Sequence, residues 1–179
     1  MNGTTRRSVL VAGGALIAGA AGCLEAGDDG DEPVPEPVSL SGRECDGCGM
    51  VIGEHYGPNA QVFYEGGDPP EDRDGPAWFD STTEALGYHE QQERRGQDKL
   101  AMYVVDYSRV DYEIHDRDAP HLSTHAEADA FVDAREATFV LGSEVLGAME
   151  PDPIPFSDPE DAEGFADEHG GDVVGFGEL

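Results

Sequence analysis

The sequence predicts an α+β fold built from two similar strand-strand-helix-strand (ββαβ) units, because one pattern of residues occurs twice. Residues 79–88 and 156–165 match at a constant offset of 77 positions, with Phe79 aligned to Phe156. In both copies an aromatic residue precedes a Ser/Asp/Thr/Pro cluster that suits a helix N-cap, with acidic residues in the first turn. Apolar residues then follow at helical spacing, namely Ala85 and Tyr88 in the first copy and Ala162 and Phe165 in the second.

Strand-like segments surround both predicted helices. In the first half they cover residues 49–52, 61–64 and 100–106, and in the second half they cover residues 137–142 and 173–176. The 138 residues from Gly42 to Leu179 suffice for one compact domain or two small ones. We therefore expect a first ββαβ unit over residues 42–106 and a second over residues 107–179.

The N-terminus has the features of an export signal. Arg6 and Arg7 directly precede an apolar run over residues 9–22, which is too short and too rich in glycine to span a bilayer. Adjacent arginines favour a twin-arginine route for residues 1–22. Small residues before Cys23 resemble a lipobox, so we expect a lipid on Cys23 and a protein held at the extracytoplasmic face of the cell membrane. The alternative is an ordinary cleaved signal with an incidental cysteine.

A polar, acidic stretch follows the signal. Residues 23–41 are rich in Gly, Asp, Glu and Pro and are predicted to form a flexible tether. The whole chain carries a formal net charge of −29, and Lys99 is its only lysine. Because molar salt shortens the Debye length to about 3 Å, a surface of this kind is typical of salt adaptation. This charge also excludes nucleic acid as a partner.

The most informative motif is a pair of cysteines followed by a methionine. Cys45 and Cys48 are two residues apart and can direct both sulfurs toward one point, and Met50 adds a thioether. Thiolate and thioether ligands together select Cu(I) over harder ions. Three other interpretations remain open: a redox dithiol, a structural zinc site completed by a histidine such as His55, and a local disulfide.

The stretch from Cys45 to Ile52 resembles the Cys-x-x-Cys-Gly-Met-x-Ile signature of the NosL family of copper-binding lipoproteins. Residues 145–149, 154–156 and 161–171 are similar to further segments of that family. The resemblance implies a metallochaperone that hands Cu(I) to nitrous oxide reductase through the membrane assembly machinery of that enzyme. It also implies the same two-unit fold. Some members carry a cysteine just after the aromatic residue that corresponds to Phe79, where this chain has Asp80.

Two further groups of residues need an interpretation. Met149 lies on a glycine-containing turn between predicted strands, so we expect it to reach the metal site and join the two halves of the chain. His169 is predicted to cap the end of a helix, although a ligand role is also possible. The stretch holding His115, His121 and His125 reads as a solvated acidic loop, and His89 as part of an exposed helix face. No nucleophile–base arrangement or phosphate loop stands out, so we expect a binding protein and no enzyme.

Overall fold

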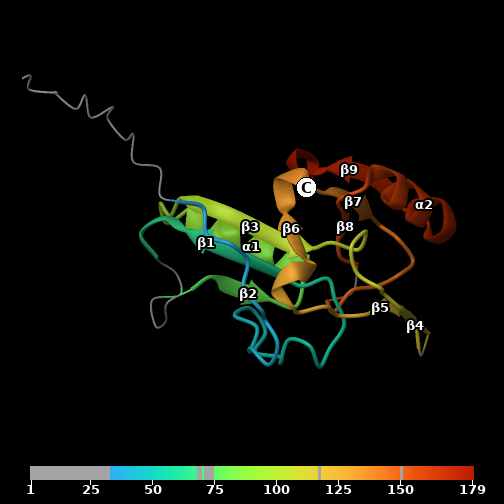
Figure 1. The fold of residues 1–179 in the computed structure, drawn as a ribbon, viewed down its shortest axis with the longest axis horizontal. Coiled ribbons are helices and arrows are strands. Elements are labelled where there is room, and N and C mark those ends of the chain that lie inside the picture. The colour runs from blue at the N-terminus through green and yellow to red at the C-terminus, as the bar shows by residue number, and fades with distance from the viewer. Residues whose placement is uncertain (1–32, 68–69, 71–74, 117, 150) are drawn as a thin grey trace, which may run out of the picture. The chain divides into compact units, whose positions relative to one another are not determined.

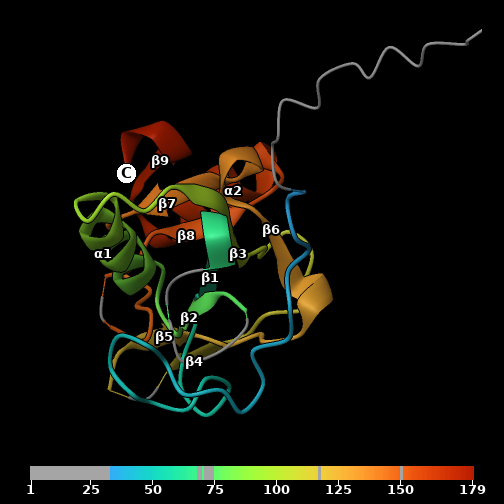
Figure 2. The same ribbon diagram turned by 90° about the vertical axis from the view of Figure 1, so that its left-hand side faces the viewer.

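The computed structural model describes residues 33–67, 70, 75–116, 118–149 and 151–179. The predicted signal sequence, Cys23 and the first part of the predicted tether lie outside these residues. The chain from Glu32 to Leu179 forms one compact unit. The described residues of this unit form two antiparallel sheets, two α-helices and a short hairpin, as Figures 1 and 2 show from two directions. The α+β class is therefore confirmed.

The larger sheet is formed mainly by the first half of the chain. It contains β1 (Ala60–Tyr64), β2 (Ala77–Phe79), β3 (Lys99–Val105) and β6 (Phe131–Asp133) in the order β2-β1-β3-β6, and all neighbours are antiparallel. Helix α1 (Thr82–Glu93) contacts β1, β2 and β3. The described residues 60–105 therefore run strand, strand, helix, strand. Strand β6 comes from the part of the chain expected to form a separate second unit, so the two halves share this sheet.

The smaller sheet belongs to the second half. Its strands β7 (Thr138–Leu141), β8 (Ile154–Phe156) and β9 (Asp172–Gly175) lie in the order β8-β7-β9. Helix α2 (Pro159–His169) contacts all three strands. The element order is again strand, strand, helix, strand, with the first strand in the centre.

The remaining elements are short. A hairpin of β4 (Ile114–Asp116) and β5 (Pro120–Leu122) lies between β3 and β6 in the sequence, where the acidic residues led us to expect a loop. The 3-10 helices are η1 (Glu65–Gly67), η2 (Ala128–Ala130), η3 (Ala134–Glu136) and η4 (Phe176–Glu178).

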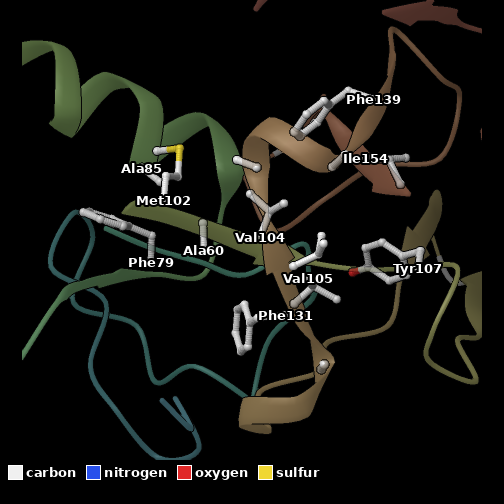
Figure 3. Packing of buried hydrophobic residues seen from close by; sticks show 14 of the residues in the cluster. Ala60, Phe79, Ala85, Met102, Val104, Val105, Tyr107, Phe131, Phe139 and Ile154 are labelled. Atoms are coloured by element: carbon white, nitrogen blue, oxygen red, sulfur yellow. The ribbon is translucent and has the colours of Figure 1, made fainter. Parts of the chain in front are cut away.

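The core runs through both halves without a break. Figure 3 shows Ala85 of α1 beside Phe79 and Met102 of the larger sheet. Val104 of that sheet belongs to the same cluster of buried residues as Phe139 and Ile154 of the smaller sheet. Each of these side chains is buried. Because burying a large apolar side chain stabilises the fold by about 1.5–3 kcal/mol, this shared core holds the two halves together.

Two expectations about the N-terminal part are corrected. Residues 33–41 do not behave as a free tether, because Leu40 is fully buried and its amide donates to the carbonyl of Ala126. Residues 49–52 do not form a strand, and only Val51 makes an isolated bridge, to Glu44. The reason is that Gly49 adopts φ 77°, a left-handed conformation that turns the chain back on itself.

Candidate metal centre

The two cysteines lie on a tight loop closed by its own backbone. The amide of Cys45 donates to the carbonyl of Met50 at 2.8 Å, and the amide of Gly49 donates to the carbonyl of Cys45 at 2.9 Å. Cys45 is buried and Cys48 is exposed, and both thiols are free. The loop thus presents one sulfur on the protein side and one on the solvent side.

Strand β2 fixes the position of this loop. The amide of Asp46 donates to the carbonyl of Trp78 at 2.9 Å, and the amide of Trp78 donates back to the Asp46 carboxylate at 2.9 Å. The indole N–H of Trp78 also donates to the carbonyl of Glu44 at 2.8 Å. These bonds hold the cysteine loop against the end of β2, next to the start of α1.

The start of α1 contributes two carboxylates. Asp80 follows β2 directly, and Glu84 lies in the first turn of α1, where its amide donates to the hydroxyl of the N-cap Ser81 at 3.2 Å. The thiol of Cys45 donates to Glu84 Oε2 at 2.9 Å, and the thiol of Cys48 lies 3.4 Å from Asp80 Oδ2. Ligand atoms of these four residues all lie within 4.8 Å of one another. We call Cys45, Cys48, Asp80 and Glu84 the thiol–carboxylate cluster.

A glycine makes the close approach of this loop to α1 possible. A Cβ atom placed on Gly47 would lie 2.8 Å from Glu84 Oε2, closer than real carbon atoms approach. A larger residue at this position would push the Glu84 carboxylate away from the cysteine loop. The glycine between the cysteines therefore serves the packing of the cluster as well as the turn.

The environment of the cluster keeps the thiols protonated. Burial raises the pKa of the Cys45 thiol far above its ordinary value, and the hydrogen bond to Glu84 raises it further. Although Cys48 is an exposed residue, its neighbours partly desolvate the thiol and so raise its pKa, and the negative charge of Asp80 adds to this effect. The pKa of Glu84 is raised as well, mainly by burial. Because thiolate is the form that binds metal, an incoming cation must displace protons from these sulfurs.

Comparison with known proteins agrees with this motif. A model of the NosL family matches residues 37–179. This chain belongs to the NosL family. The copper-binding lipoprotein NosL of Stutzerimonas stutzeri is 34% identical over 145 residues, covering 80% of this chain and 66% of that protein. The copper-binding lipoprotein NosL of Achromobacter cycloclastes is 30% identical over 134 residues, covering 74% of this chain and 61% of that protein. The matches thus span slightly less than two thirds of either relative.

A solved structure gives the same result for the fold of this NosL-family chain. The crystal structure of the copper chaperone NosL from Shewanella denitrificans aligns with a TM-score of 0.64 at 27% identity, covering 83% of this chain and 97% of that one. Among the residues described here, no helix combines the length and the apolar character needed to cross a bilayer.

Met50 and Met149, the two methionines predicted to take part, lie on different loops. Met50 is half-buried and ends the cysteine loop. Met149 has 42% of its surface exposed, in the loop before Asp152. The Asp152 carboxylate accepts hydrogen bonds from the Ser81 hydroxyl at 2.9 Å and from the Thr83 amide at 2.8 Å. The Met149 loop is therefore attached to the end of α1 that carries the carboxylates of the cluster.

No histidine that the structure describes belongs to the thiol–carboxylate cluster of this NosL-family chain. His169 packs against the ring of Phe165 at the end of α2 and is not part of the thiol–carboxylate cluster. His89, His115, His121 and His125 are half-buried, so the expectation of solvated side chains is wrong. Their partners are aromatic rings such as Tyr56, Tyr64 and Tyr107, which no local sequence pattern links to them.

Sequence reasoning missed Glu84 as a member of the cluster. Its position was readable as the acidic residue of a Ser-x-x-Glu helix start, but this pattern usually indicates a cap. Asp80 was singled out only as the position where family members carry a cysteine. The structure puts the Asp80 carboxylate next to the Cys48 sulfur, so a side chain at this position faces the cluster.

Proposed function

We propose that this NosL-family protein is a membrane-anchored copper chaperone that carries Cu(I) on Cys45 and Cys48. The observation that carries the proposal is the pair of free thiols, whose sulfurs lie within 4.8 Å of each other and of two carboxylates. The names of the relatives from Stutzerimonas stutzeri, Achromobacter cycloclastes and Shewanella denitrificans agree with copper as the cargo. Binding and transfer, with no catalysis, is the proposed activity.

Sulfur ligands are the reason to propose the monovalent ion. Soft thiolates prefer Cu(I), whereas the carboxylates of Asp80 and Glu84 are poor ligands for it. We assign these carboxylates the role of accepting the protons that leave the thiols as copper enters. Their contacts with Cys48 and Cys45 put them within reach of those protons.

Unequal exposure of the two sulfurs supports release to an acceptor. Cys45 has only 4% of its surface exposed, whereas Cys48 is open to solvent. An acceptor ligand can approach Cys48 and replace it while Cys45 still holds the ion. We propose nitrous oxide reductase, or the membrane machinery that assembles it, as the acceptor.

Met50 or Met149 is proposed to complete the site with a thioether. Met50 is two residues from Cys48, and Met149 is exposed on the loop that Asp152 ties to α1. A ligand set of two thiolates and one thioether is low-coordinate and leaves room for an acceptor. We also propose that the two strand-strand-helix-strand segments are related by duplication, since residues 79–88 and 156–165 match in sequence.

The redox alternative has less support. A reactive dithiol needs at least one thiol with a lowered pKa, as occurs at the N-terminus of a helix. Here the pKa values of Cys45 and Cys48 are both raised, first by burial and then by neighbouring carboxylates. Such thiols are weak nucleophiles at neutral pH, whereas a metal ion can still displace their protons.

Copper transfer tests the proposed function. The chain loaded with one Cu(I) is mixed with copper-free nitrous oxide reductase, and copper in each protein is measured after separation. We expect movement of copper from the wild type, and faster loss to a competing chelator from Cys48→Ser than from wild type. Turnover of insulin disulfides together with retention of copper would instead support the redox protein.

Membrane attachment through Cys23 is a separate proposal. It rests on the small residues before Cys23 and on the lipoprotein names of two relatives. Fractionation of cells that make wild type or Cys23→Ser tests it. We expect wild type in the membrane fraction and the variant in the soluble fraction or unprocessed. A processed variant that stays fully in the membrane fraction would contradict the lipid anchor.

A further inference from the structure

We propose that His115 and His121 form a second metal site, which takes a divalent first-row ion on imidazole nitrogen. The site lies on the β4–β5 hairpin, and none of its residues belongs to the thiol–carboxylate cluster. It rests on the hairpin and the neighbouring residues 54–56, and is independent of the proposed Cu(I) chemistry.

The register of the hairpin makes the two histidines direct cross-strand partners. His115 and His121 are directly opposite partners in the antiparallel pair β4–β5. Side chains of such partners project from the same face of a sheet, with Cβ atoms about 4.5–5.5 Å apart. Two imidazoles at this spacing can hold one ion between them, while water fills its other positions.

The ring of Tyr56 neighbours both histidines. Its ring stacks on the ring of His121, with centroids 4.2 Å apart and planes inclined by 22°, and it lies 6.1 Å from the ring of His115. Stacking uses the face of the imidazole, whereas metal binding uses a nitrogen lone pair in the ring plane. The tyrosine therefore orients His121 without occupying its ligand position.

A backbone carbonyl selects the nitrogen of His121 that is left for a metal. Nδ1 of His121 lies 2.8 Å from the carbonyl oxygen of Ala119, so Nδ1 carries the proton and donates to this oxygen. The lone pair of Nε2 is then free to bind a cation. Metal-binding histidines usually have their second nitrogen fixed in this way, because the bond sets the tautomer and the ring orientation.

The surroundings admit a hydrated cation. A cavity of about 470 Å³ is lined by His115 of the pair, and also by Glu54, His55 and Tyr56. Glu54 and His55, which also line it, are exposed and offer further polar groups. The net charge of −29 attracts cations to the whole molecule, so selectivity must come from the imidazoles.

Cu(II) is the probe of choice, because nitrogen sites bind it most strongly among the divalent first-row ions. The experiment uses the full chain with Cys45→Ser and Cys48→Ser, so that the thiols cannot contribute. Cu(II) alone is titrated, and electron paramagnetic resonance records the coupling to coordinated nitrogen. We expect the parent protein to bind one equivalent of Cu(II), with coupling to nitrogen in the spectrum. Either His115→Gln or His121→Gln should weaken this binding at least tenfold.

His169→Gln is the matched control, because it removes a half-buried histidine from α2. We expect it to leave the affinity and the spectrum unchanged. Equal affinities and spectra in the parent, His115→Gln and His121→Gln would overturn the proposal, as would an equal loss in His169→Gln.

A second measurement uses the wild-type protein, in which both cysteines are present. Wild type is saturated with Cu(I), which gives no paramagnetic signal, and is then titrated with Cu(II). The same nitrogen-coupled spectrum, abolished by His115→Gln, supports the second site. Its absence from wild type, from the double cysteine variant, or from both overturns the proposal. The result in the double cysteine variant does not depend on whether the thiols hold copper. The histidine site can therefore be refuted while the proposed Cu(I) site stands, and the reverse also holds.

Discussion

The Ser81 hydroxyl donates a 2.9 Å hydrogen bond to the carboxylate of Asp152, and this bond joins two distant parts of the chain inside the protein. Ser81 is the N-cap of α1, and Asp152 lies just before β8 in the second half. Both side chains are buried, and the same carboxylate accepts from the Thr83 amide. The Asp152 contact therefore anchors the second half at the helix end that carries Asp80 and Glu84.

Replacing Asp152 is expected to destabilise the protein strongly. Asp152→Ala leaves the buried Ser81 hydroxyl without its acceptor, which costs about 1–3 kcal/mol, and the part-buried Thr83 amide loses the same acceptor. Asp158→Ala is the matched control. The Asp158 carboxylate caps α2 by accepting an exposed hydrogen bond from the Glu160 amide, and the loss of this cap costs about 1 kcal/mol. Urea unfolding at high salt measures both variants. A smaller loss for Asp152→Ala than for Asp158→Ala would contradict the anchoring role.

Introducing sulfur at position 80 is expected to strengthen copper binding. Asp80→Cys puts a third thiol where a carboxylate now lies 3.4 Å from the Cys48 sulfur. Because Cu(I) prefers thiolate to carboxylate, the affinity should rise at least about tenfold, or 1.4 kcal/mol. Asp98→Cys adds an equivalent thiol at an exposed position outside the cluster and should leave the affinity unchanged. Equal effects of the two variants would show that position 80 has no special relation to the metal.

Much of this architecture was predictable from local sequence patterns. The helices at residues 82–93 and 159–169 follow from N-cap residues and apolar spacing around Ala85 and Ala162. The hairpin β4–β5 and the strand β6 were missed, because each of these strands is only three residues long and shows no extended alternation of apolar and polar residues. Pairing of β6 with β3 depends on contacts between distant residues, which periodicity does not reveal.

The candidate site was predictable only in part. Cys45 and Cys48 are recognisable from their spacing, because the sequence separation alone brings the sulfurs together. Glu84 is 39 residues from Cys45, and only the packing of α1 against the cysteine loop brings them into contact. The Asp152 contact was unpredictable for the same reason, since it connects residues 71 positions apart.

Stability is expected to depend on salt. At a net charge of −29 the folded chain repels itself, and molar salt reduces this repulsion by shortening the Debye length to about 3 Å. The melting temperature should therefore rise steadily from low to molar potassium chloride. Sucrose at matched osmolality serves as the uncharged control and should raise it less. A melting temperature that stays flat or falls with salt would contradict this prediction.

Mild acid is expected to weaken the fold partly through His89. Burial lowers the pKa of His89, and nearby Lys99 lowers it further, so the folded state holds this side chain neutral. The unfolded chain binds a proton at His89 more readily than the folded chain does. The neutral His89 side chain therefore contributes its full share of stability above about pH 6.5, and this share is lost as the pH falls through the pKa of the folded state. His89→Gln should therefore make the fall in melting temperature between pH 7 and pH 5 shallower. His55→Gln, at an exposed position, is the control, and equal slopes for wild type and His89→Gln would refute the assignment.

The measurement that tests the central claim most directly is a Cu(I) titration against a chromogenic chelator. It compares wild type with Cys45→Ser, Cys48→Ser, Met50→Leu and Met149→Leu, each first shown to be folded by circular dichroism at high salt. We predict that either cysteine variant binds Cu(I) at least about tenfold more weakly, or by 1.4 kcal/mol, and that one of the two methionine variants does so as well. Unchanged affinity in Met149→Leu alone would remove only the contribution of the second half. Unchanged affinity in both Cys45→Ser and Cys48→Ser would contradict the copper site.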